Sequence, residues 1–142
     1  MNYHFKIRKD GKWFVAQCVE LDGCITQGEG QQHLNEMMLE ALSLFLDEPE
    51  DSTIIFPMPD PSIKGRNIVA VPVDTSVALA MVVRQSRLER RMTQRQVADK
   101  LGMKHIYQYQ KLERGRTANP ELRTLAKLKS LYPKMSVDAI LS

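Results

Sequence analysis

Hydrophobic and polar residues alternate at the start of the chain, in residues 2–8. A period of two predicts a strand with one buried and one exposed face. Asp10 and Gly11 follow, and because both tolerate a positive φ they predict a hairpin turn. Residues 13–19 are apolar on both faces and predict a returning strand inside the sheet, and residues 24–27 predict a short third strand.

The hydrophobic period then becomes helical. Apolar residues recur at helical spacing in residues 31–47 and predict one amphipathic helix. Residues 48–65 contain four prolines among acidic and small residues, which predicts a loop. Residues 67–74 predict a further strand, which has to pair with the strands of the first domain. Residues 1–75 therefore predict a small β-β-β-α-β domain, one helix on a sheet, which includes the proline-rich loop.

Only helical patterns fill residues 76–142, so we expect an α+β protein that divides near residues 74–76. One helix is predicted to end near Arg91. Thr93 and Gln96 then form a capping box, which predicts the start of the next helix. Its buried edge is Val97, Ala98 and Leu101, and Gly102 suits a left-handed exit.

Two or three further helices are expected after Gly102. The first covers about residues 104–114 and ends at Gly115. The sequence Asn-Pro-Glu at residues 119–121 supplies a cap, a proline and an acid, and predicts the start of another helix. The core face of that helix is expected at Leu122, Leu125, Ala126 and Leu128. Residues 136–141 predict a short last helix.

Charge divides the chain in the same place. Residues 1–75 carry 6 Lys and Arg against 12 Asp and Glu, a net charge of −6, and residues 76–142 carry 14 against 5, a net charge of +9. A basic half attracts polyanions and an acidic half suits a basic protein, although surface solvation alone can produce either sign.

Other chemistry is sparse. Cys18 and Cys24 could pair or bind a metal, but the three histidines are scattered, so we expect two reduced thiols, no metal site and no cofactor. No apolar run is long enough to span a membrane, and residues 1–10 lack the apolar stretch of a secretion signal. We therefore expect a cytoplasmic protein without a membrane partner.

The stretch TQRQVADKLG, residues 93–102, places Ala98 and Gly102 four residues apart. A small side chain where two helices cross and a glycine where the chain reverses allow a second helix to enter a DNA major groove. Together with LERGRTANPELRTLAKL, residues 112–128, this region resembles the Xre/Cro type of repressor helix-turn-helix domain. That family has TQxxLAxxLG, a Glu-x-Gly and NPxLxTLxK in this order. The resemblance covers about residues 77–142 and implies binding to double-stranded operator DNA.

The chain departs from that family by one additional residue between Gly102 and Glu113. Counting back from Glu113 places Tyr109 where the family packs an Ile or Val, so we infer an insertion near residues 104–107. The resemblance implies that Gln94 holds a DNA phosphate. Candidates for reading base edges are His105, Gln108 and Gln110. Candidates for phosphate contacts are Lys104, Lys111, Arg114 and Arg116. The alternative is a solvated helix face on which Glu113 and the arginines pair locally.

The acidic half carries no evident catalytic set. Glu20 and Asp22 could act as an acid and base or hold Mg²⁺, but a two-metal nuclease needs several converging carboxylates, which the strand-facing positions do not supply. We therefore expect no enzymatic activity.

The motifs DGKWFVA, ELDGCITQGE, EAL and PMPDPS resemble HicB-type antitoxins, whose N-terminal domain is a degraded ribonuclease-H-like fold. The departures are Val19-Glu20 in place of Pro-Asp, and Gln32-His33-Leu34 in place of a more acidic helix start. The resemblance implies a partner, a small basic HicA-type ribonuclease toxin. Plausible acidic contacts to such a toxin are Glu20, Asp22, Glu48 and Asp51.

Together these patterns predict an antitoxin of a toxin–antitoxin pair, with an acidic domain at residues 1–75 that neutralises the toxin and a basic domain at residues 76–142 that represses the operon. One helix-turn-helix domain contacts only a half-site, so a homodimer or higher oligomer is expected. The alternative is a plain transcriptional repressor whose N-terminal domain senses a small molecule or dimerises.

Overall fold

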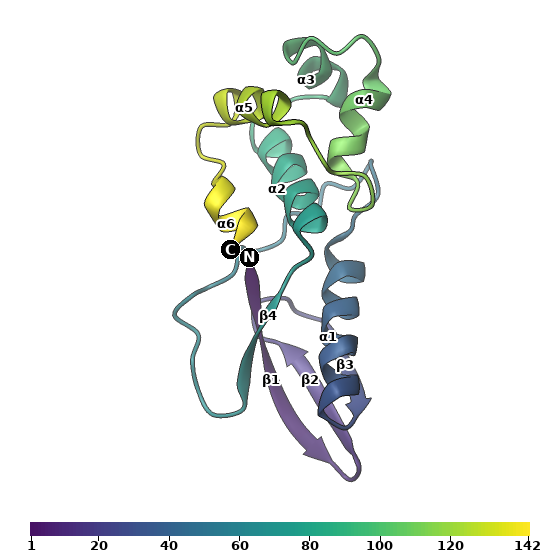
Figure 1. Cartoon of the computed structure of the whole chain (residues 1–142), viewed down its shortest axis with the longest axis vertical. Coiled ribbons are helices and arrows are strands. Elements are labelled where there is room, and N and C mark those ends of the chain that lie inside the picture. The colour runs from purple at the N-terminus through teal and green to yellow at the C-terminus, as the bar shows by residue number, and fades with distance from the viewer. The chain divides into compact units, whose positions relative to one another are not determined.

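The computed structural model describes residues 1–142 and has two compact units (Figure 1). The first unit comprises Met1–Leu46 and Phe56–Asp74, and the second comprises Asp47–Ile55 and Thr75–Ser142. A sheet with one helix is followed by helices, so the α+β fold class is confirmed.

Asp47–Ile55, here called the acidic segment, packs with the helical unit, whereas the sequence assigned the whole proline-rich loop to the first domain. It carries four acidic residues and no Lys or Arg. The first unit therefore has 6 basic against 8 acidic residues, and the helical unit has 14 against 9. The first unit is therefore acidic and the helical unit basic, but their net charges differ less than those of residues 1–75 and 76–142.

The first unit is a four-stranded antiparallel sheet with the order β3-β2-β1-β4. Its strands are β1 (Asn2–Asp10), β2 (Trp13–Cys18), β3 (Ile25–Glu29) and β4 (Ile68–Pro72). The returning strand lies inside the sheet, as predicted. The helix α1 (Gln31–Leu46) packs mainly on β3 and β2, and the core between them is built from Tyr3, Phe5, Ala16, Leu34, Met38 and Leu42.

Gly28 explains how closely α1 approaches the sheet. A Cβ added at this position would lie 2.6 Å from the backbone Cα of Leu34. Because the start of α1 fills this space, Gly28 serves helix–strand packing, and the chain turns into α1 at Gly30, which has a φ of +87°.

The helical unit contains α2 (Thr75–Glu89), α3 (Gln94–Lys100), α4 (Ile106–Gln110), the 3₁₀ turn η1 (Lys111–Glu113), α5 (Leu122–Leu131) and α6 (Val137–Leu141). The predicted capping box is present. The Gln96 N–H donates to Thr93 Oγ1 at 3.1 Å, and the Thr93 N–H donates to Gln96 Oε1 at 2.9 Å. Gly102 has a φ of +73°, which confirms the left-handed exit.

Two predicted details of the later helices are wrong. His105 is extended, so α4 begins only at Ile106, and the expected helix 104–114 ends as a 3₁₀ turn. The helix α5 begins at Leu122, after the extended Glu121, rather than at the predicted Asn-Pro cap. Leu122 is 81% exposed and Ala126 is also exposed, whereas Leu128 is buried.

Finally, no helix of the structure combines the length and the apolar character that a membrane span requires.

Candidate nucleic-acid interface

The helices α3 and α4 pack against each other, so one side of α4 is buried and the other side is exposed. Tyr109 is fully buried, together with Val97, Ala98 and Leu112. This burial agrees with the inferred one-residue insertion, since Tyr109 takes the core position that counting back from Glu113 gave it. Successive helical residues are rotated by about 100°, so burial of Tyr109 turns the residues one and two positions before it away from the core.

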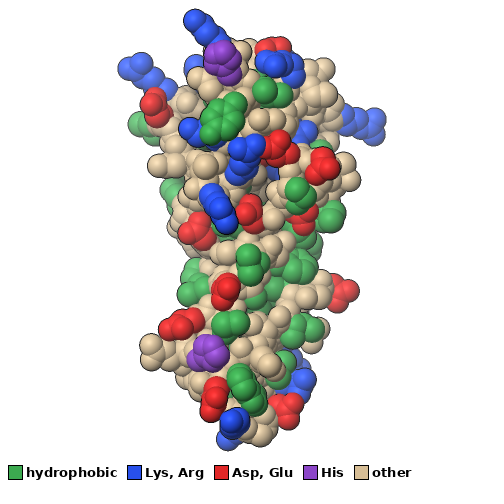
Figure 2. Space-filling view, turned by 90° about the vertical axis from the view of Figure 1, so that its right-hand side faces the viewer, with side chains coloured by type: hydrophobic (Ala, Val, Ile, Leu, Met, Phe, Trp, Pro, Cys, Tyr) green, Lys and Arg blue, Asp and Glu red, His purple; other side chains and the backbone are tan.

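This rotation exposes Tyr107 and Gln108, and residues just before and just after α4 are exposed as well. We call this set the α4 surface, and its members are Lys104, His105, Tyr107, Gln108 and Lys111. Gln108 Oε1 also accepts a hydrogen bond from the His105 backbone N–H at 3.4 Å. Arg116 is exposed beyond the 3₁₀ turn. Figure 2 shows Lys and Arg side chains concentrated over the upper, helical part of the face that it draws.

Tyr107 is a further exposed member of the α4 surface that was not predicted from the sequence, because the predicted contacts are polar and cationic side chains. Tyr107 is 55% exposed, and the Lys111 Nζ and Arg114 Cζ atoms lie 5.6 Å and 5.8 Å from the centroid of its ring. A cation over an aromatic ring is attracted by the ring electrons, so Tyr107 helps to orient both cations. The available signal was its spacing, four residues before Lys111 and two before the buried Tyr109.

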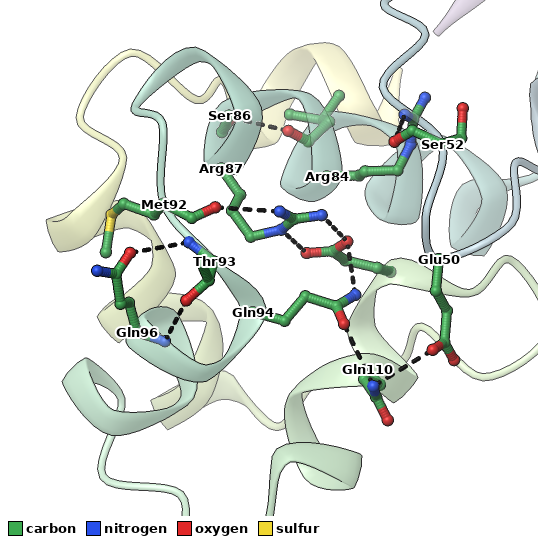
Figure 3. Close-up of polar contacts among 12 residues, drawn as sticks. Glu50, Ser52, Arg84, Ser86, Arg87, Met92, Thr93, Gln94, Gln96 and Gln110 are labelled. Carbon is green, nitrogen blue, oxygen red and sulfur yellow. Dashed lines mark hydrogen bonds and ion pairs between the residues drawn. The ribbon is translucent and has the colours of Figure 1, made fainter.

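Arg87, labelled in Figure 3, forms a buried ion pair with Glu113 of the 3₁₀ turn that follows α4. Glu113 receives two hydrogen bonds from Arg87, from Nε at 2.7 Å and from Nη2 at 3.0 Å, and the two side chains are only 1% and 8% exposed. Burial alone would lower the pKa of Arg87, but the hydrogen bonds and charge of Glu113 raise it above its usual value. Glu113 thus pairs with the buried Arg87.

Gln94 connects this ion pair to α4. Its Nε2 donates to Glu113 Oε1 at 3.2 Å, and its Oε1 accepts from Gln110 Nε2 at 3.2 Å. Gln94 is thereby fixed at the start of α3. Gln110 points toward Gln94 rather than onto the α4 surface (Figure 3).

Gln110 and Arg114 also contact the acidic segment. Gln110 Nε2 donates to Glu50 Oε2 at 3.3 Å, and Arg114 forms an ion pair with Glu50. The eight predicted DNA-binding residues therefore fall into two groups. Five are exposed, namely Lys104, His105, Gln108, Lys111 and Arg116, and three are partly buried in this network, namely Gln94, Gln110 and Arg114.

The four acidic candidates for a protein partner are not brought together. The Glu20 side chain is 4% exposed, and it accepts hydrogen bonds from the His4 backbone and ring and from the Asp60 N–H, at 2.9, 2.8 and 3.2 Å. Burial alone would raise the pKa of Glu20, but these hydrogen bonds hold it below its usual value. Asp22 and Asp51 are exposed and Glu48 is partly buried. Glu48 and Asp51 belong to the acidic segment, whereas Asp22 lies in the first unit.

No group of three or more His, Cys, Asp or Glu side chains in the structure could hold a metal ion. Cys18 and Cys24 are both buried and free.

The helical unit thus contains two packed helices, α3 and α4, and exposes part of the second one. In agreement, residues 83–136 match the family model described as helix-turn-helix. This match supports an Xre-type helix-turn-helix in the C-terminal part of the chain, and with it binding to double-stranded DNA and transcriptional regulation. A comparison with curated proteins found no significant match to the chain.

Proposed function

We propose that this chain is an operator-binding repressor that also acts as the antitoxin of a small basic toxin. The DNA-binding part is carried by one observation, the exposed and cationic α4 surface held on a buried ion pair. In this proposal α4 enters the major groove. His105 and Gln108 reach base edges, and Lys104, Lys111 and Arg116 contact phosphates.

The rigidity of the support favours this role. A recognition helix has to present its side chains in a fixed geometry, and a hydrogen-bond network built on a buried ion pair provides it. Gln94 is the predicted phosphate contact and is held on two sides, by Glu113 and Gln110. Gln110 serves better as a positioning residue for Gln94 than as a base contact.

Salt dependence tests the electrostatic part of the proposal. Each half-site would use three exposed cations, and a dimer would therefore neutralise about six phosphates. The logarithm of the association constant should then fall by roughly five per tenfold increase in salt concentration. A slope below about two would contradict a phosphate-binding surface of this size.

The antitoxin part rests on the HicB-like motifs of residues 1–75 and on the acidic residues available to a basic partner. We propose that the partner is a HicA-type toxin and that Asp22, Glu48 and Asp51 are its acidic contacts. Glu20 is less suited to this role, because its carboxylate is already used by His4 and Asp60 inside the first unit.

A growth-rescue experiment separates the antitoxin from a plain repressor. The full chain would be co-expressed with any small basic gene product encoded next to it, and complex formation would be checked by co-purification. A His105→Ala/Gln108→Ala variant serves as the matched control, because it should lose its preference for the operator yet still rescue growth. If the gene product is harmless, or toxic but neither bound nor neutralised, the chain is a plain repressor whose first unit senses a small molecule or dimerises.

A further inference from the structure

The acidic segment lies against hydrogen-bond donors at the C-terminal end of α4 and just after it. Glu50 contacts Gln110 and Arg114, as described above. The Asp47 side chain accepts a hydrogen bond from the Gly115 backbone N–H at 3.1 Å. Two carboxylates of one short segment thus bind an amide, a guanidinium and a backbone N–H of the helix-turn-helix region.

These donors are of the kind that holds DNA phosphates. Side-chain amides, arginines and backbone N–H groups are among the groups that contact phosphates in protein–DNA complexes. A carboxylate and a phosphate present the same feature to them, anionic oxygens that accept charge-assisted hydrogen bonds. A phosphate that reached Arg114 or Gly115 would lie beside the carboxylates of Glu50 and Asp47. The negative charges of the phosphate and the carboxylates would repel one another.

We infer that the acidic segment is a built-in competitor of DNA, with Asp47 and Glu50 occupying phosphate-binding donors at Gly115, Arg114 and Gln110. DNA must displace the segment to engage the helical unit fully. This inference rests on the proposed DNA-binding function and adds a regulatory contact to it.

The contacts of the segment are suited to release. The side chains of Arg114 and Glu50 are 40% and 37% exposed, and ion pairs at this exposure are weak and screened by salt. A second attachment is the hydrogen bond from Arg84 Nη1 to the Ser52 carbonyl, at 3.2 Å (Figure 3). Arg84 is only 2% exposed, and its Nη2 has no hydrogen-bond partner. Hydration of this buried guanidinium on release would offset part of the lost contacts.

Gly115 shows that the segment is closely seated when it is in place. A Cβ added there would lie 3.0 Å from Asp47 Oδ1 and 2.9 Å from Val77 Cγ2. The backbone N–H of Gly115 is therefore covered by Asp47, and a phosphate cannot share this position.

The test compares Glu50→Gln with Asp51→Asn in the full-length chain. Both variants remove one negative charge from the acidic segment, but Asp51 is exposed and makes none of the contacts described above. Binding is measured by fluorescence anisotropy with a labelled random-sequence DNA duplex over a series of salt concentrations. Circular dichroism confirms that each variant is folded.

Freeing Arg114 should add one phosphate contact. At about 0.1 M salt, Glu50→Gln should then tighten binding roughly eightfold and steepen the salt slope by about 0.9. Asp51→Asn should change the affinity less than about twofold, as expected for an exposed charge outside the contact. In an Arg114→Gln background, the gain in DNA affinity from Glu50→Gln should fall below about twofold, because the guanidinium that Glu50→Gln frees is absent.

Hydrogen exchange provides an independent readout. Addition of DNA should speed exchange in residues 47–55, because the segment is displaced. Equal affinities for Glu50→Gln and Asp51→Asn, or protection of the segment by DNA, would overturn the inference while leaving DNA binding intact. If neither the wild-type chain nor any variant binds the duplex, the proposed DNA-binding function fails together with the inference.

Discussion

Replacement of Glu113 by glutamine removes the negative charge from the buried ion pair with Arg87 but keeps the shape of the side chain. The two side chains are 1% and 8% exposed, so the guanidinium of Arg87 would remain out of water without its counter-charge. Breaking a buried pair in this way typically costs about 3–5 kcal/mol. For a unit of this size, each kcal/mol lowers the melting temperature by roughly 4–8 °C, so a decrease of about 12 °C or more is expected.

Two spectroscopic signals separate this effect from changes in the first unit. The only tryptophan, Trp13, belongs to the first unit, so its fluorescence follows that unit during urea unfolding. Circular dichroism at 222 nm is dominated by helices, most of which belong to the second unit. Glu113→Gln should shift the circular dichroism transition much more than the fluorescence transition.

The double variant Arg87→Met/Glu113→Leu is the control. It replaces the pair by apolar side chains of similar size, which is often close to neutral for stability. The Met92 carbonyl would lose its hydrogen bond from Arg87 Nη1, so recovery should be incomplete. The double variant should still regain at least about 2 kcal/mol of the loss caused by Glu113→Gln. A single-variant loss below about 1 kcal/mol, or no recovery in the double variant, would refute the reasoning.

Three further predictions concern the same unit. Gln108→Ala should weaken binding to the cognate operator alone by about 1–3 kcal/mol, whereas Arg116→Ala should weaken binding to all duplexes about equally. Fluorescence anisotropy with the operator and with an unrelated duplex distinguishes the two variants. If both variants weaken binding to the two duplexes in the same way, the register of α4 is wrong. Burial, helped by the charge of Glu113, raises the pKa of Tyr109, so its contribution to stability is complete below pH of about 10 and is lost at higher pH. Tyr109→Phe should therefore reduce the alkaline loss of unfolding free energy, which approaches about 1.4 kcal/mol per pH unit well above pH 10, and urea unfolding at several pH values between 9 and 11 measures this loss. Thr93→Ala should cost about 1 kcal/mol through loss of the cap on α3, and an unchanged melting temperature would show that the capping box does not contribute.

Local patterns predicted the elements that depend on local physics. Alternation identified β1, helical spacing identified α1, and the capping box placed the start of α3 at the correct residue. The buried Tyr109 could be anticipated because a family resemblance supplied a reference point at Glu113.

Features that depend on distant contacts could not be predicted. Helical spacing placed Leu122 on a core face, but spacing does not say whether a partner covers that face, and Leu122 is exposed. Prolines identified residues 48–65 as a loop, but they carry no information about what the loop packs against. For the same reason Gln110 was expected on an open surface, whereas its amide contacts Glu50, 60 positions earlier in the chain.

The most direct test of the central claim is a competition between two duplexes for the full-length chain. One duplex carries the sequence upstream of its own gene, and the other has the same composition in scrambled order. We predict that the wild-type chain prefers the upstream duplex, and that His105→Ala/Gln108→Ala abolishes this preference while binding both duplexes weakly through the remaining cations of the α4 surface and Arg116. If the wild-type chain binds both duplexes equally, or if the double variant retains the full preference, α4 is not the element that reads the DNA sequence.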